Sequence, residues 1–144
     1  MVDVTYRNGK LLFTSDGTDF SITGMGNAQL LGLSNDTVHA IKPSANISAV
    51  EQGSEVTLNS TGNNGGLEIG GSVKSYRRIH LSGNDIEIAV GASLETINDS
   101  IEMNAGKTGV VKGDLIAGGP GSDVRLQAAT SLTLSGDIVA SDLI

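Results

Sequence analysis

The fold is decided by four triplets of the form apolar–x–apolar: Val56-Thr57-Leu58, Ile79-His80-Leu81, Ile101-Glu102-Met103 and Val124-Arg125-Leu126. Their first residues lie 23, 22 and 23 positions apart. Two further series keep step with them: Val73, Leu94, Leu115 and Ile138, and then Leu67-Glu68-Ile69, Ile86-Glu87-Ile88, Val110-Val111 and Leu132-Thr133-Leu134. Apolar residues that alternate with variable ones have period two, which is typical of strands and not of helices.

Three such runs in about 22 residues predict three strands per coil, with the coils stacked in a parallel β-solenoid. Corners rich in glycine and asparagine separate the runs, because these residues tolerate tight turns. We expect roughly five coils, stacked about 4.8 Å apart. The alternative is an intertwined trimeric spike, in which a strand spacing of about seven to eight residues is the true repeat. The parallel recurrence of three distinguishable series favours the single chain.

The N-terminal residues differ from the repeat and predict a cap. Residues 2–14 alternate apolar and polar side chains around Asn8-Gly9, which is a typical β-hairpin turn. We expect residues 1–29 to form an N-terminal hairpin cap and residues 30–144 to form the solenoid coils, as one structural domain overall. Capping units cover the core and the free strand edges at the end of a solenoid.

The composition fits a core of stacked aliphatic side chains. The chain has 144 residues with 20 Gly, two Phe, two Tyr and no Trp. Its net charge of −7 disfavours nucleic acid as a partner, and no apolar stretch is long enough for membrane insertion. The absence of Cys excludes disulfides and thiolate chemistry. We expect a cytoplasmic protein if the chain is full length, and an extracellular or cell-surface one if it is a fragment of an exoprotein.

Two known families share the pattern of the C-terminal residues. The stretch Ser131-Leu-Thr-Leu-Ser-Gly-Asp-Ile-Val-Ala140 resembles the repeats of filamentous-haemagglutinin-type adhesins, and the resemblance covers about residues 56–144. It implies a right-handed parallel β-helix that forms the shaft of a secreted bacterial protein. Lys112-Gly-Asp-Leu-Ile-Ala117 also resembles bactofilins, the polymer-forming β-helices of the bacterial cytoskeleton. The expected fold is therefore all-β: a single-chain right-handed parallel β-helix with three-strand coils of about 22 residues and an N-terminal β-hairpin cap.

One basic and aromatic cluster differs from the rest of this acidic chain: Lys74, Tyr76, Arg77, Arg78 and His80. Such a cluster suits a phosphate, a sulfate or an acidic sugar, with Tyr76 stacking on a sugar ring. The alternative is a solvated face whose charges are balanced by acidic residues on adjacent coils. A carbohydrate- or anion-binding module is therefore our second functional hypothesis.

The other motifs do not assemble a catalytic, cofactor or metal site. The segment 105–108, Ala-Gly-Lys-Thr, resembles the end of a phosphate-binding loop, but Ile101 stands where that motif needs Gly, so a coil corner is the better interpretation. The segment 118–126 nearly fits a calcium-binding nonapeptide, with Arg125 in its apolar position. The carboxylate pairs are interpreted as solubilising outer-face charge: Asp16 and Asp19, Asp85 and Glu87, Asp99 and Glu102. We therefore predict no enzyme activity and no cofactor; a polysaccharide lyase or pectinase would need a convergent Asp, Arg and His set.

The C-terminal run Asp142-Leu143-Ile144 is apolar and has no obvious cap. An open coil offers strand edges and an apolar core to a neighbour, so Leu143 and Ile144 are candidate self-association residues. We expect a non-catalytic shaft, scaffold or surface-adhesion module that associates with itself, end to end or laterally, with a surface glycan or another protein as further partners. A polymer-forming cytoskeletal scaffold and a trimeric phage or secretion-system spike are the alternatives.

Overall fold

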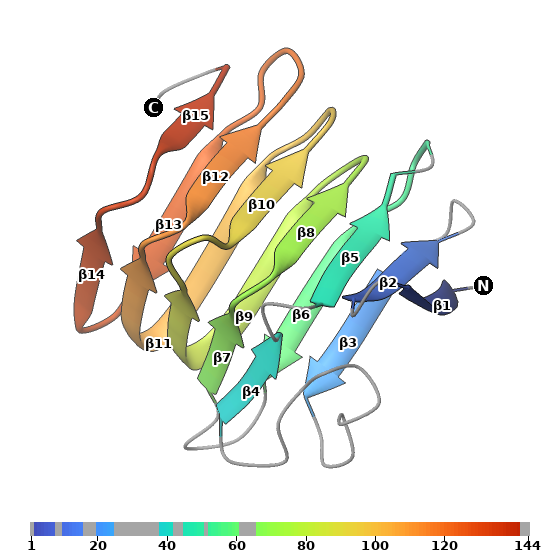
Figure 1. The fold of residues 1–144 in the computed structure, drawn as a ribbon. Helices are drawn as coiled ribbons and strands as arrows, with labels where there is room; N and C mark the ends of the chain where they lie inside the picture. The colour runs from blue at the N-terminus through green and yellow to red at the C-terminus, as the bar shows by residue number, and fades with distance from the viewer. Residues whose placement is uncertain are drawn as a thin grey trace.

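The computed structural model describes residues 2–7, 10–15, 20–24, 38–41, 45–50, 52–60 and 66–141. These residues form strands and turns, with no helix among them. The strands build two sheets that wrap around one core into three faces (Figure 1). The fold is the right-handed parallel β-helix that the sequence predicts.

Face 1 is the seven-stranded sheet. Its order is β1 (Val2–Arg7), β2 (Lys10–Ser15), β5 (Ala45–Ala49), β8 (Ser72–Ser75), β10 (Ser93–Thr96), β12 (Asp114–Ala117) and β15 (Ile138–Ala140). The eight-stranded sheet forms faces 2 and 3, because its long strands β9 (Ile79–Ile88) and β11 (Ile101–Val111) run through both. Face 2 also contains β3 (Phe20–Gly24), β6 (Val56–Ser60) and β13 (Val124–Ala128). Face 3 also contains β4 (Val38–Ile41), β7 (Gly66–Ile69) and β14 (Ser131–Leu134).

The strand registers confirm that the predicted series stack on one another. Ile101 pairs in parallel with Ile79 on one side and with Val124 on the other, which are 22 and 23 residues away. Leu94 likewise pairs with its second-series neighbours in β8 and β12. These partners belong to one chain, so a single-chain solenoid and not an intertwined trimer explains the pairing. The five strands on face 2 are separated by four turns.

The third series needs one correction. Ile86 pairs in β11 with Gly109 and not with Val110, which pairs instead with Glu87 and is only half-buried. Met103 extends from face 2 towards this position, and its Cε would lie 2.9 Å from a Cβ added at Gly109. The long methionine side chain therefore fills core volume that the glycine leaves open.

The segment 105–108 is a bend inside β11. Ala105 pairs with Gly83 and Thr108 pairs with Asp85, so two residues of β11 stand opposite one residue of β9. A bulge of this kind bends its strand. The bend carries β11 from face 2 to face 3, which makes this segment a coil corner.

The N-terminal hairpin is present, and its second strand is already part of the solenoid. β1 pairs antiparallel with β2 from Val2↔Ser15 to Arg7↔Lys10; Asn8 and Gly9 lie outside the described residues. β2 then runs parallel to β5, and β3 runs parallel to β6. The first coil is longer than the later ones, since the partners Phe20 and Val56 are 36 residues apart. The division of the chain at residue 29 stays a prediction.

The core is a stack of inward aliphatic side chains. Ile79, Leu94 and Ile101 are each 0% exposed, and burying one such side chain contributes about 1.5–3 kcal/mol. Buried hydroxyls line the corner between face 1 and face 2. Ser54 Oγ donates to the carbonyl oxygen of Ala49 (2.5 Å), and Ser122 Oγ donates to that of Ala117 (3.0 Å). These bonds satisfy carbonyl groups at the ends of face 1 strands, where an unpaired group would be costly.

Candidate functional site

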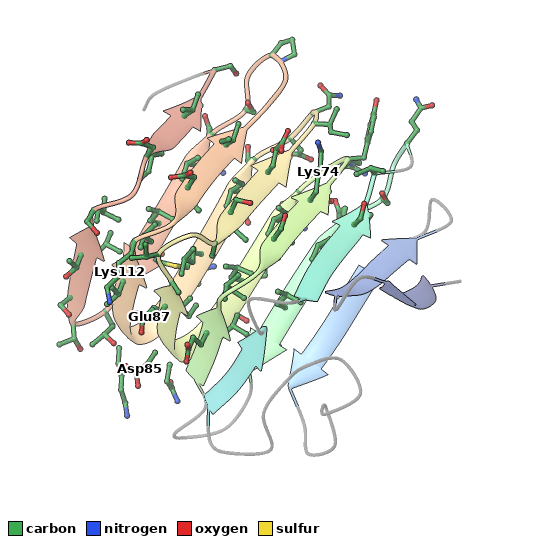
Figure 2. The ribbon with its side chains drawn as sticks, viewed as in Figure 1. Lys74, Asp85, Glu87 and Lys112 are labelled. Carbon is green, nitrogen blue, oxygen red and sulfur yellow. The ribbon has the colours of Figure 1, made fainter. Side chains whose placement is uncertain are left out.

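The residues of the predicted basic cluster are divided between two faces. Lys74 lies in β8 on face 1, where Figure 2 labels it. Arg77 and Arg78 are exposed in the corner between β8 and β9, beside the half-buried Tyr76. His80 lies in β9 on face 2. The structure therefore does not bring these five side chains together on one surface.

Acidic residues on adjacent coils surround the two arginines. Arg77 Nη2 lies 3.7 Å from Glu55 Oε1, and Arg77 Nε lies 3.6 Å from Asp99 Oδ2. Arg78 Nη2 lies 3.8 Å from Glu55 Oε2, and Arg78 Nη1 lies 3.7 Å from Glu102 Oε2. Lys74 has a partner of the same kind, since its Nζ lies 3.3 Å from an oxygen of Glu95. An anionic ligand would have to displace these carboxylates.

A charge ladder of three residues in register continues along face 2: His80, Glu102 and Arg125. Glu102 Oε2 lies 3.3 Å from His80 Nδ1, and Glu102 Oε1 lies 3.8 Å from Arg125 Nη1. Arg125 Nη2 also donates to the nearly buried carboxylate of Asp123 at 2.6 Å. The geometry favours the charge-balanced face over a vacant anion site, and the assignment of the 74–80 cluster as a ligand site stays a prediction.

The charge ladder predicts that Glu102 matters more for stability than Glu95. The Glu102 carboxylate is 22% exposed and faces three cationic side chains, whereas the Glu95 carboxylate is 42% exposed and faces one lysine. We expect Glu102→Gln to lower the free energy of unfolding by about 1–2 kcal/mol and Glu95→Gln to lower it by less than about 1 kcal/mol. Urea unfolding at low salt measures both. Equal losses, or a Glu102→Gln loss that persists unchanged in about 1 M salt, would contradict this expectation.

The remaining sequence motifs are also occupied by contacts within the chain. On face 3, Asp85 Oδ1 accepts from Thr108 Oγ1 (2.6 Å), and Glu87 Oε1 accepts from Lys112 Nζ (2.8 Å). Figure 2 shows Glu87 and Lys112 on neighbouring coils. In the glycine-rich segment 118–126, the Asp123 carboxylate is bonded to Arg125. Asp16 and Asp19 lie outside the described residues, and within the described ones no three His, Cys, Asp or Glu side chains are grouped for a metal ion.

The last described coil, residues 124–141, differs from all coils before it; we call it the open coil. Leu134 lies in one inward column with Val111 and Ile88, through successive pairings on face 3. Val111 and Ile88 are 0% exposed, but Leu134 is 49% exposed. The neighbouring inward residue Leu132 is 39% exposed. The open coil therefore presents core side chains to solvent.

The strands of the open coil also have free edges. Among the described strands, β13 and β14 pair only with β11, and β15 pairs only with β12. An outer concavity of about 520 Å³ follows β13, between Arg125 and Gln127 on that strand and Glu102 and Asn104 on β11. Unpaired backbone groups on a flat, exposed edge are a template for another strand.

The sequence pointed to this end of the molecule but to other residues. Leu143 and Ile144 lie outside the described residues, so their proposed role is untested. Leu132 and Leu134 carry the exposed apolar surface instead, and the pattern places both in the core series. The signal was nonetheless present, because no further copy of the repeat follows the coil that begins at Val124 in these 144 residues.

Comparisons with protein-family models, with curated proteins and with solved structures find no match. Over the part of the chain that the structure describes, no helix has the length and apolar character needed to cross a membrane. The function must therefore be inferred from the geometry of the strands themselves.

Proposed function

We propose that this chain is a non-catalytic structural module, a shaft, scaffold or surface-adhesion element, that associates with itself through the open coil. One observation carries the proposal: the inward column that is 0% exposed at Ile88 and Val111 becomes 49% exposed at Leu134. Contiguous apolar surface of this kind marks an interaction site in soluble proteins. The resemblance to adhesin repeats supports the same role.

The free strand edges strengthen the proposal. A neighbour that adds strands to β13, β14 and β15 would bury Leu132 and Leu134 and would pair the backbone groups of all three strands. The open coil has 18 residues (124–141), which is slightly below the roughly 20–30 residues per side of a standard interface. We therefore expect a reversible association that depends on protein concentration.

Replacing Leu134 by Asp tests the proposal. Sedimentation velocity of the unmodified chain should show association as its concentration rises to about 1 mM, where any complex with a Kd of 1 mM or below is populated. Leu134→Asp should abolish that association, because the new carboxylate would be buried without a partner at the contact. Val90→Asp is the matched control, since Val90 is 79% exposed in the turn between β9 and β10, away from the open coil.

Circular dichroism should show the same strand content in both variants. If Leu134→Asp does not fold, Leu134→Ser replaces it as a milder polar substitution. A chain that stays monomeric throughout the concentration range would refute the proposed function, as would association that Leu134→Asp and Leu134→Ser leave intact.

A further inference from the structure

The two ends of the stack are built differently, and this difference restricts how two copies can meet. At the N-terminal end, face 1 ends in β1, which runs antiparallel to β2. At the other end, all three faces finish on the parallel strands β13, β14 and β15 (Figure 1). The first end carries one strand that breaks the parallel order, and the second carries none.

Head-to-tail stacking does not fit these ends. To continue the solenoid, β3 of the next copy would have to lie on β13, and β4 of the next copy on β14. The strand before β3 in the chain is β2, so β2 of the next copy would need the place that β15 already fills. If β1 of the next copy instead lies on β15, faces 2 and 3 are left with room for two strands each, a gap of about 10 Å.

The tail end, in contrast, can meet a second copy of itself. Resting on the proposed self-association, we propose that two copies dock tail to tail about a two-fold axis that passes through β14. The chain rises by one strand spacing per coil, so at the tail β13 is lowest, β14 is intermediate and β15 is highest. An axis through β14 sets the low β13 of each copy against the high β15 of the other. An axis through β13 or β15 leaves a mismatch of one strand spacing, about 4.8 Å.

The charges at the tail are self-complementary in this arrangement. Residues 126–136 contain no charged side chain, so two β14 strands meet on the axis without like-charge repulsion. On either side, β13 faces β15 of the other copy. Pairing Val124 with Ile138 of the partner keeps inward residues together and places Arg125 opposite Asp137 of the partner. Arg125 is 64% exposed and Asp137 is exposed, and opposite charges across paired strands stabilise the pairing.

This geometry makes the assembly a closed dimer. A two-fold contact uses the same surface on both copies and leaves no tail free for a third. The pair is therefore limited to two chains, with the two N-terminal hairpins at its far ends.

A cysteine on the axis tests the docking geometry, because the chain has no Cys of its own. Thr133 lies on the exposed outer side of β14, close to its own copy across the axis. Under mild oxidation, Thr133→Cys should form a disulfide-linked dimer rapidly, since bridging needs Cα atoms about 4.4–6.8 Å apart. Val90→Cys is the control, because Val90 is more exposed but remote from the tail; it should cross-link at least tenfold more slowly.

A charge reversal tests the Arg125–Asp137 contact independently. Asp137→Lys should weaken dimerisation at least tenfold, because it sets a lysine against the arginine of the partner. Asp114→Lys is matched to it, since Asp114 is exposed on the coil below, 23 residues earlier; it should leave dimerisation within about twofold.

The outcomes separate the two proposals. Dimers that neither cross-link through Thr133→Cys nor respond to Asp137→Lys would overturn the two-fold geometry while the self-association stands, and so would oligomers that grow beyond two chains. A strictly monomeric chain would overturn both.

Discussion

Deleting residues 79–100 leaves a shorter protein that still folds, whereas deleting residues 79–89 abolishes folding. The longer deletion removes 22 residues, which is one whole coil because Ile79 pairs with Ile101. It joins Arg78 to Ile101, so that β11 takes the place of β9 beside β6 and β7, and β12 takes the place of β10 beside β8. The shorter deletion removes β9 and Ala89 only, and β10 would then follow Arg78 on the wrong face.

The physical reason is that each coil of a solenoid contacts only its neighbours, so stability is close to a sum over coils and their interfaces. Circular dichroism and urea unfolding test both deletions. The 22-residue deletion should retain the strand signal and a cooperative transition at a lower urea midpoint, and the 11-residue deletion should show neither. Similar behaviour of the two variants would contradict the coil as the structural unit.

Gly113→Ala should lower the free energy of unfolding by about 3 kcal/mol, at the upper end of the range for overpacking. Gly113 lies at the corner between face 3 and face 1, directly over the coil below. A Cβ added there would lie 2.4 Å from the carbonyl oxygen of Ala92 and 2.7 Å from that of Ala89. Both contacts are backbone atoms that hydrogen-bond to the next coil, since Asp114 N donates to the Ala92 oxygen at 3.0 Å. The clash cannot be relieved without separating the coils.

Gly106→Ala is the matched control. Its added Cβ would lie 2.8 Å from Asn84 Oδ1, which is the far end of a side chain that can rotate. Gly106 is also exposed, at the bend of β11. We expect a loss below about 1 kcal/mol for this variant. Urea midpoints compare the two, and an equal shift would show that the Gly113 corner has more room than its contacts indicate.

The spacing of the triplets was enough to predict the fold, because stacking forces one residue type to return at one interval. Ile79 and Ile101 could be paired from the sequence alone for this reason. Gly109 could not be found, because a pattern of apolar letters does not register a glycine in an inward position. Its neighbour Met103 fills the space from another face, and only the folded chain brings the two together.

The candidate sites were harder to predict, because their partners lie one coil away. The basic residues are neighbours in sequence, but the carboxylates that balance them are 21 to 24 residues distant: Lys74–Glu95, Arg77–Asp99 and Arg78–Glu102 are 21, 22 and 24 apart. The exposure of Leu134 depends on the absence of a covering coil. A residue of the same type and register, Val111, is fully buried when that coil is present.

The charge ladder also distinguishes coils that otherwise look alike. Since the inward residues of every coil are similar, a folding chain could dock a coil on the wrong neighbour and bury almost as much apolar surface. The outward signs differ between these pairings. If the coil 101–123 were skipped, Arg125 would meet His80 and Arg78 in place of Glu102, and like charges would oppose one another. Each ion pair between adjacent coils thus acts as an address that assigns a coil its place, and a repeated core becomes an ordered sequence of distinct steps.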